Sequence, residues 1–218
     1  MGFEGFLSRT MAENDIKDRA KVAQIKQYLD TAPPLQTLGE LFSALKHKKI
    51  DLVGLQISLK AGVKASAEEL NACDFVILDV SLSSDDLDLV RRLKARLNAP
   101  LLIPIKTCDE YSITQARIIG ADGVVINPLH QSPEQTQMAI EIARDLRLES
   151  ILMCKCKASL DQSRYHDSDW LLVPNLLVQD NLSLLSSRQV IVSDLIETQL
   201  KYVSALKDKV LLGSIDPQ

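Results

Sequence analysis

The sequence predicts an α/β barrel, a (β/α)8 fold, because short apolar runs alternate with helical segments from residue 51 onward. The clearest repeat is residues 100–128, in which one apolar run ends at Lys106 and a helical segment leads through a Gly-containing turn into a second run. Two apolar strands joined in this way are expected to lie parallel and to be buried on both faces. An open doubly wound sheet is the alternative arrangement. The eight predicted strands are Leu52–Ile57, Phe75–Val80, Leu101–Ile105, Val124–Ile126, Ile151–Cys154, Trp170–Val173, Val190–Val192 and Val210–Leu212.

Helical segments are expected between these runs because apolar residues recur there at spacings of three and four. Ser83, Ser132 and Ser193 or Asp194 are predicted N-caps, and Pro133 suits the first position of a helix. The predicted helices are Ala67–Asn71, Asp85–Leu97, Asp109–Ile119, Pro133–Leu146, Ser159–Tyr165, Leu182–Ser187 and Glu197–Leu206.

The first 50 residues are predicted to form a helical extension of a single domain that covers residues 1–218. A first helix should end at Ala32–Pro34, since proline lacks an N–H group, and a second should begin near Thr37. We expect these two helices to cap or plug one end of the barrel. The chain stops soon after the last predicted strand, so we expect no eighth helix. The N-terminal helices, a second copy of the chain or a partner protein would then cover that flank.

The composition is that of an ordinary globular protein, with 46% hydrophobic and 25% charged residues. A net charge of −4 and 4% aromatic residues give no indication of a nucleic acid or a membrane as partner. No apolar run approaches the roughly 20 residues of a membrane helix. We therefore expect a cytoplasmic protein whose four cysteines are reduced, and we predict no cofactor and no metal.

Four stretches, in chain order, resemble the indole-3-glycerol phosphate synthase family of phosphate-binding barrels, which belongs to tryptophan biosynthesis. Residues 32–46 are similar to the extension that precedes the first strand of those enzymes. Lys106 with Tyr111–Asp122 resembles their strand-3 lysine and the helix that follows it. Asn175 stands where a strand-6 asparagine is expected, and Leu211–Ser214 matches a phosphate-binding Gly-Ser on strand 8.

The resemblance implies a set of site residues and a reaction. Members of the family close an indole ring with loss of CO2, using a Glu-x-Lys on strand 1, the strand-3 lysine, and glutamates on strands 5 and 7. By resemblance, Lys106 and Asn175 are the candidate catalytic residues, and Gly213 and Ser214 are the candidate phosphate-binding residues.

The chain departs from this pattern at the remaining family positions. Leu55 and Ile57 stand at the strand-1 positions, Cys154 at the strand-5 glutamate, and Ser193 and Asp194 at the start of the strand-7 Glu-Ser-Gly. General acid–base catalysis needs a titratable group at bond-making distance, and most of these residues offer none. The interpretation is a divergent relative that has lost ring closure and acts in binding or assembly.

The alternative is an active lyase or isomerase on a phosphorylated small molecule, using Lys106 with Asn175 and Asp194. On either interpretation the expected ligand is a phosphorylated small molecule. Lys106 could also be a solvated side chain or the ion-pair partner of Asp79 at the end of the second predicted strand.

Two further residue types, cysteine and histidine, are candidates for a site. Alternation along a strand would put Cys154 and Cys156 on one face, where core thiols are favoured over a metal or redox pair because no second ligand pair accompanies them. His130 and His166 fall in loops at opposite ends of the predicted barrel. We expect both to be surface histidines.

Overall fold

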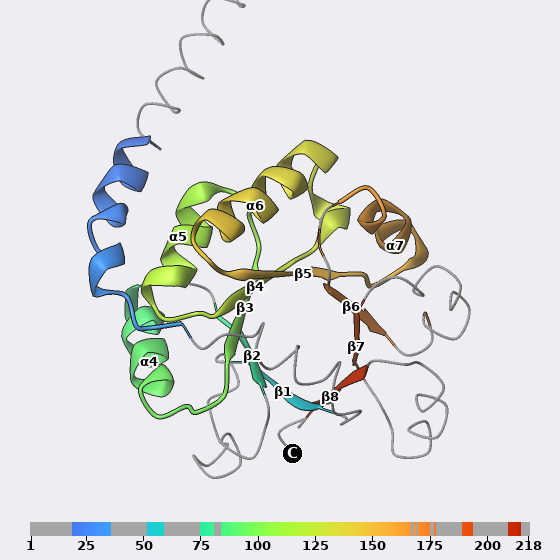
Figure 1. Ribbon diagram of the computed structural model, residues 1–218, viewed down its shortest axis with the longest axis horizontal. Helices are drawn as coiled ribbons and strands as arrows, with labels where there is room; N and C mark the ends of the chain where they lie inside the picture. The colour runs from blue at the N-terminus through green and yellow to red at the C-terminus, as the bar shows by residue number, and fades with distance from the viewer. Residues whose placement is uncertain are drawn as a thin grey trace, which may run out of the picture.

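The computed structural model describes residues 19–35, 52–58, 75–80, 84–166, 168, 170–174, 177, 189–193 and 209–214. Its strands run parallel and pair in sequence order, and β1 also pairs with β8, so that they form a ring (Figure 1). The strands are β1 (Leu52–Ser58), β2 (Phe75–Asp79), β3 (Leu101–Ile105), β4 (Gly123–Ile126), β5 (Glu149–Met153), β6 (Trp170–Pro174), β7 (Gln189–Ser193) and β8 (Lys209–Ser214). The predicted α/β class and the curved parallel sheet are confirmed.

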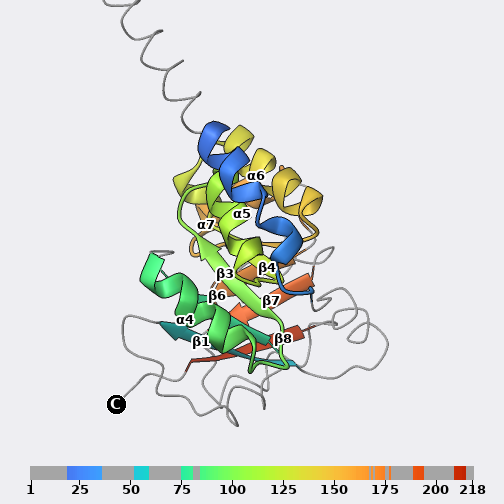
Figure 2. The same ribbon diagram turned by 90° about the vertical axis from the view of Figure 1, so that its left-hand side faces the viewer.

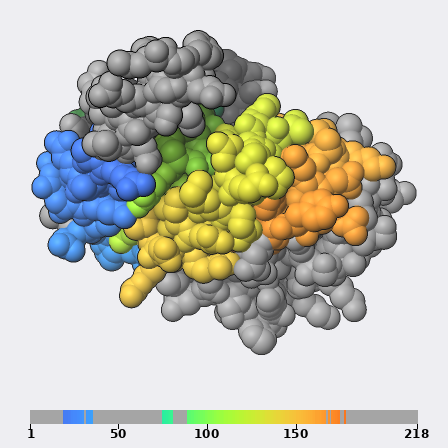
Figure 3. Space-filling model, turned by 90° about the horizontal axis from the view of Figure 1, so that it is seen from above, coloured from blue at the N-terminus to red at the C-terminus, as the bar shows by residue number. Residues whose placement is uncertain are grey.

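Helices lie on the outer surface of this sheet (Figure 2). The described helices between strands are α4 (Ser84–Lys94), α5 (Glu110–Ile118), α6 (Pro133–Asp145) and α7 (Lys157–Ser163), with short 3-10 helices η1 (Leu29–Thr31) and η3 (Pro128–His130). Figure 3 shows α6 on the surface between α5 and α7. The other predicted connections lie outside the described residues, so the complete (β/α)8 repeat and the missing last helix remain predictions.

Local hydrogen bonds explain where two of these helices begin. The Asp109 carboxylate accepts the Ser112 backbone N–H at 2.8 Å and so caps α5. Ser132 and Gln135 form a capping box before α6. The N-cap at Ser132 and the helix start at Pro133 were predicted. Helix α7 begins two residues earlier than predicted.

The strands separate two apolar layers. The outer layer joins strand residues such as Ile103 and Leu152 to residues of the helices, whereas the inner cluster is made of strand residues alone. The inner cluster consists of Phe75, Ile77, Leu102, Val125, Ile151, Trp170 and Leu172, with Met153 packed against it. Side chains therefore alternate along β2 to β6 between the barrel interior and the helix layer, as buried parallel strands require.

The N-terminal segment lies along the outside of α5 (Figures 1 and 2). Residues 19–26 are helical, and η1 ends at Thr31. Its C-cap Ala32 has an extended backbone, as the two following prolines predicted. Lys26 forms an ion pair with Glu110, and the Arg117 Nη1 atom donates to the Pro33 carbonyl at 2.8 Å. That the N-terminal helices cap or plug an end of the barrel stays a prediction. The second predicted helix lies outside the described residues.

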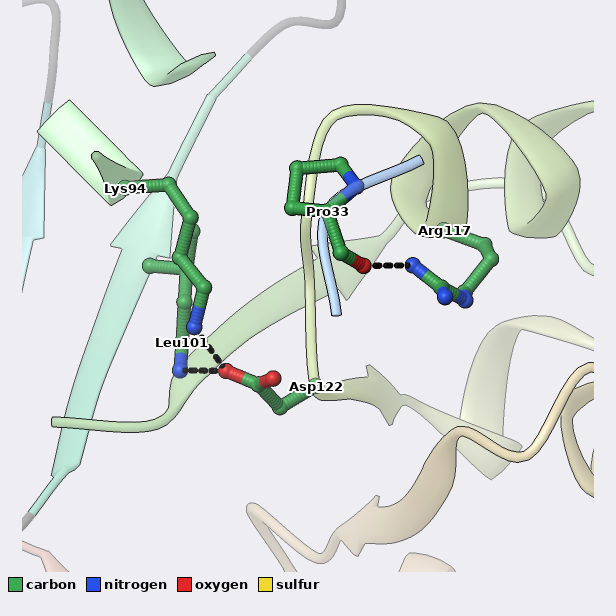
Figure 4. Close-up of polar contacts among 5 residues, drawn as sticks. All are labelled: Pro33, Lys94, Leu101, Arg117 and Asp122. Atoms are coloured by element: carbon green, nitrogen blue, oxygen red, sulfur yellow. Dashed lines mark hydrogen bonds and ion pairs between the residues drawn. The ribbon is translucent and has the colours of Figure 1, made fainter. Parts of the chain in front are cut away.

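A buried ion pair connects α4, β3 and the turn before β4 (Figure 4). One carboxylate oxygen of Asp122 accepts from the Lys94 Nζ atom at 2.5 Å and from the Leu101 backbone N–H at 2.7 Å. The Asp122 N–H in turn donates to the Leu101 carbonyl at 2.8 Å. Both charged side chains are almost completely shielded from solvent, with exposed fractions of 5% for Lys94 and 0% for Asp122.

The turn that presents Asp122 requires glycine at position 120. Gly120 has φ = 98°, in the region that side chains rarely adopt, and an added Cβ would lie 2.9 Å from the Lys94 Cγ atom and 3.0 Å from Pro33. Nearby, burial lowers the pKa of the Arg117 guanidinium and the charge of Asp122 opposes that shift. The Gly-Ala-Asp turn thus has a structural role at the amino end of the strands.

Substituting Asp122→Asn should lower the free energy of unfolding by about 3 to 5 kcal/mol, because the buried Lys94 ammonium loses its carboxylate. The matched control is Lys26→Met, which removes an ion pair whose side chains are 47% and 42% exposed and should cost less than about 1 kcal/mol. Urea unfolding of the three proteins measures both effects. Equal losses in the two variants would contradict the role given to the buried pair.

Candidate functional site

The carboxyl ends of the strands form the candidate site, because this end of a parallel barrel is where functional side chains gather. Leu102 faces the interior, while Ile103 and Ile105 belong to the outer layer. Continued alternation turns Lys106, the next residue, toward the interior at the mouth. Asp79 reaches the same mouth from the end of β2, since Ile77 also faces inward.

The backbone around Lys106 is held by the neighbouring loop. The Gln131 side-chain amide donates to the Lys106 carbonyl at 3.2 Å. Pairing of Ile105 with Ile126 places Lys106 beside Asn127, whose side-chain oxygen accepts the Leu129 N–H and so caps η3. The Lys106 side chain is exposed and forms no ion pair with Asp79 or any other residue of the described ranges. A cation is thus available at the mouth.

On β5, the side chain that faces the interior near the mouth is that of Met153. Cys154 belongs to the outer layer, is completely buried, and has its Sγ atom 3.6 Å from the Ser159 carbonyl of α7. The prediction that Cys154 takes the place of a mouth-facing glutamate is therefore corrected. The strand ends one residue earlier than predicted, and the inward positions of β5 are Ile151 and Met153, both apolar.

The expectation that Cys154 and Cys156 share one face of a strand is also wrong. Cys156 lies beyond β5 at the N-cap of α7, where hydrogen bonds from the backbone and side chain of Ser159 lower the pKa of its thiol. Burial, reinforced by the charge of Asp109, raises the pKa of Cys108 to about 11. Within the described ranges, no group of three His, Cys, Asp or Glu side chains is placed to hold a metal ion.

The two histidines differ from the expectation in one respect. His130 is exposed, as predicted, but His166 is buried with an exposed fraction of 5%. It follows α7, near the amino end of β6, and so lies away from Lys106. The two histidines do not belong to one site.

The remaining predicted site residues are placed only through their backbones. Pairing of β8 with β1 sets Gly213 against Leu55, and Ser214 follows at the carboxyl end of β8. Ile57 lies near the end of β1, and Ser193 ends β7 opposite Pro174 of β6. Asn175 and Asp194 lie outside the described residues. Sequence reasoning missed the inward position of Met153, which the in–out alternation along β5 would have indicated.

Comparison with known proteins agrees with an α/β barrel. No family model matches the chain. The chain is 31% identical over 81 residues to an indole-3-glycerol phosphate synthase of Rhodopirellula baltica. That match covers 37% of this chain and 31% of the relative, so it spans about a third of the length of the relative.

Solved structures resemble a larger share of the chain. An HpcH/HpaI aldolase/citrate lyase family protein from Burkholderia cenocepacia has a TM-score of 0.60 at 13% identity, over 81% of this chain and 93% of that chain. The tryptophan synthase α subunit from Legionella pneumophila has a TM-score of 0.59 at 15% identity, over 80% and 85%. The 3-keto-L-gulonate-6-phosphate decarboxylase from Vibrio cholerae has a TM-score of 0.60 at 12% identity, over 75% and 88%. At these identities the likeness shows the fold alone.

The described part of the chain contains no helix that is both long and apolar enough to cross a lipid bilayer.

Thiol labelling tests the surroundings of the cysteines. In the folded protein at pH 7, maleimide should label Cys156 at least about tenfold faster than Cys108 or Cys154, because the thiolate is the nucleophile and its lowered pKa favours that form. The rate at Cys156 should rise with pH and level off at a lower pH than for a free cysteine. Peptide mass mapping separates the four sites, and Cys156→Ser is the control. Native labelling of Cys108 at the rate of Cys156 would contradict the placement.

Proposed function

We propose that this protein is a divergent barrel of the indole-3-glycerol phosphate synthase type that binds a phosphorylated small molecule at its mouth without closing an indole ring. The observation that carries the proposal is the inner face of β5, which ends in Ile151 and Met153. A thioether and an alkyl chain cannot transfer a proton, so this strand supplies no general acid or base to the mouth.

The cation at the mouth supports a binding role. Lys106 is exposed and has no ion-pair partner in the described ranges. It lies on the same side of β3 as the inward-facing Leu102. A lysine ammonium is a common ligand of phosphate groups. Gly213 and Ser214 at the end of β8 would add backbone N–H groups to the same ligand, as the resemblance implies.

The second candidate is an active carbon–carbon lyase or isomerase on a phosphorylated small molecule. The same availability of the Lys106 ammonium favours it, since a mouth lysine can stabilise a developing negative charge. Asn175 and Asp194 would have to provide the remaining chemistry. The two candidates differ in whether Lys106 supports turnover or only binding.

One experiment separates the candidates. The protein is incubated with the indole-forming anilino-deoxyribulose phosphate, and indole fluorescence and the thermal midpoint are followed together. We expect a ligand-dependent rise in the midpoint that falls by at least about half in Lys106→Ala, and no indole. Arg164→Ala, which removes an exposed cation at the C-cap of α7, away from the mouth, is the matched control and should leave the midpoint shift unchanged.

Indole formation that disappears in Lys106→Ala would overturn the binding proposal and establish the lyase. Absence of both turnover and a midpoint shift would contradict both candidates. We extend the proposal to assembly: the single domain of residues 1–218 would bind a second copy of the chain or a partner protein. A strict monomer in sedimentation of the same sample would contradict self-assembly.

A further inference from the structure

A polar cavity of about 330 Å³ lies at the amino ends of β5 and β6. It is at the opposite end of the strands from Lys106, which follows the carboxyl end of β3. The cavity therefore does not belong to the mouth. Its polar and aromatic lining comes from the end of α6 and the starts of the two strands: Arg144, Arg147, Glu149, Ser150, Ser168 and Trp170.

Arg147 has an unusual backbone for its residue type. Its φ of 59° is the only positive value at a non-glycine residue in the described ranges. The position follows the C-cap of α6, where the Leu148 N–H donates to the Ala143 carbonyl and the Arg147 N–H donates to the Arg144 carbonyl. This is a Schellman motif, in which glycine is the favoured residue. An arginine in a left-handed conformation beside a cavity is an outlier that points to a use for its side chain.

The two guanidinium groups make the cavity suitable for an anion. Arg144 and Arg147 bring two positive charges against the single carboxylate of Glu149. The Arg147 side chain is exposed and makes no hydrogen bond or ion pair with any residue that the structure describes. The Ala143 and Arg144 carbonyls at the end of α6 already accept backbone N–H groups. They are therefore not free acceptors that would repel an anion in the cavity.

The other side of the cavity is fixed by hydrogen bonds. The Ser168 hydroxyl donates to the Ser150 carbonyl at 2.9 Å, and the Trp170 backbone N–H donates to the Ser168 hydroxyl oxygen at 3.4 Å. Trp170 is 6% exposed and packs with the inner cluster, so the indole is held in place beside the polar lining. A rigid wall with an aromatic surface suits the carbon skeleton of a small ligand.

We propose that this cavity binds a phosphate group, either free phosphate or the phosphate of a small ester, through Arg144 and Arg147. Guanidinium groups match the geometry of phosphate oxygens and can bind them through two parallel hydrogen bonds. The volume lies at the lower end of the range for small-molecule sites, which limits an ester to a few carbon atoms beyond the phosphate.

Arg147→Gly tests the proposal with two opposite readouts. Glycine relieves the left-handed backbone, so the variant should melt about 2 to 4 °C higher than the parent protein. The same variant should lose the stabilisation that inorganic phosphate gives the parent. For the parent we expect a rise of about 3 to 6 °C when phosphate is tenfold above its dissociation constant, with sodium chloride used to match ionic strength.

Two controls locate the effect. Arg164→Gly makes the same substitution at the C-cap of α7, where φ is an ordinary −66°, and should leave the phosphate-dependent shift intact. Lys106→Ala removes the cation of the mouth, so the part of the shift that comes from the amino-end cavity should remain in this variant and be lost when Arg147→Gly is added. A shift that survives in the double variant Arg147→Gly with Lys106→Ala, a shift abolished by Lys106→Ala alone, or no shift in the parent would overturn the proposal. Tighter binding of glycerol 3-phosphate than of phosphate would assign the site to an ester, and equal binding would assign it to free phosphate.

Discussion

The described part of the barrel depends on the hydrogen bonds and the ion pair that the buried Asp122 carboxylate forms. This carboxylate accepts the Leu101 N–H at the start of β3 and the Lys94 ammonium from the end of α4, while its own backbone leads into β4. A buried charge is tolerated only when it is paired and hydrogen-bonded, so these contacts fix the relative positions of one helix and two strands. Gly120 makes the approach possible because no side chain fits between Lys94 and Pro33.

The two ends of the barrel differ in how their polar groups are used. At the amino end, Asp122 and Lys94 satisfy each other inside the protein, and their role is structural. At the carboxyl end, Lys106 is exposed to solvent, while the inward side of β5 near the mouth is apolar. A cation without a carboxylate from β5 suits binding of an anionic ligand better than proton transfer. This contrast is the basis of the binding role that we propose.

The sequence predicts the fold well because parallel strands buried on both faces must be continuous apolar runs. The direction of single side chains at strand ends is harder, because it depends on where pairing stops. By resemblance Cys154 stands at the strand-5 glutamate position, but β5 ends at Met153 and Cys154 faces α7. The cavity of Arg147 and Trp170 gave no sequence signal, since its residues come together only when the end of α6 meets the starts of β5 and β6, and a left-handed arginine cannot be read from composition.

Hydrogen exchange at the Leu101 amide tests the central role of Asp122 most directly. This N–H donates to the buried carboxylate, so it should exchange only when the barrel unfolds, with a protection free energy equal to that of global unfolding. In Asp122→Asn, the Leu101 amide and the amides that pair β3 with β4 should lose protection together. Fast exchange at Leu101 in the parent protein, while the amides between β3 and β4 stay protected, would contradict the account.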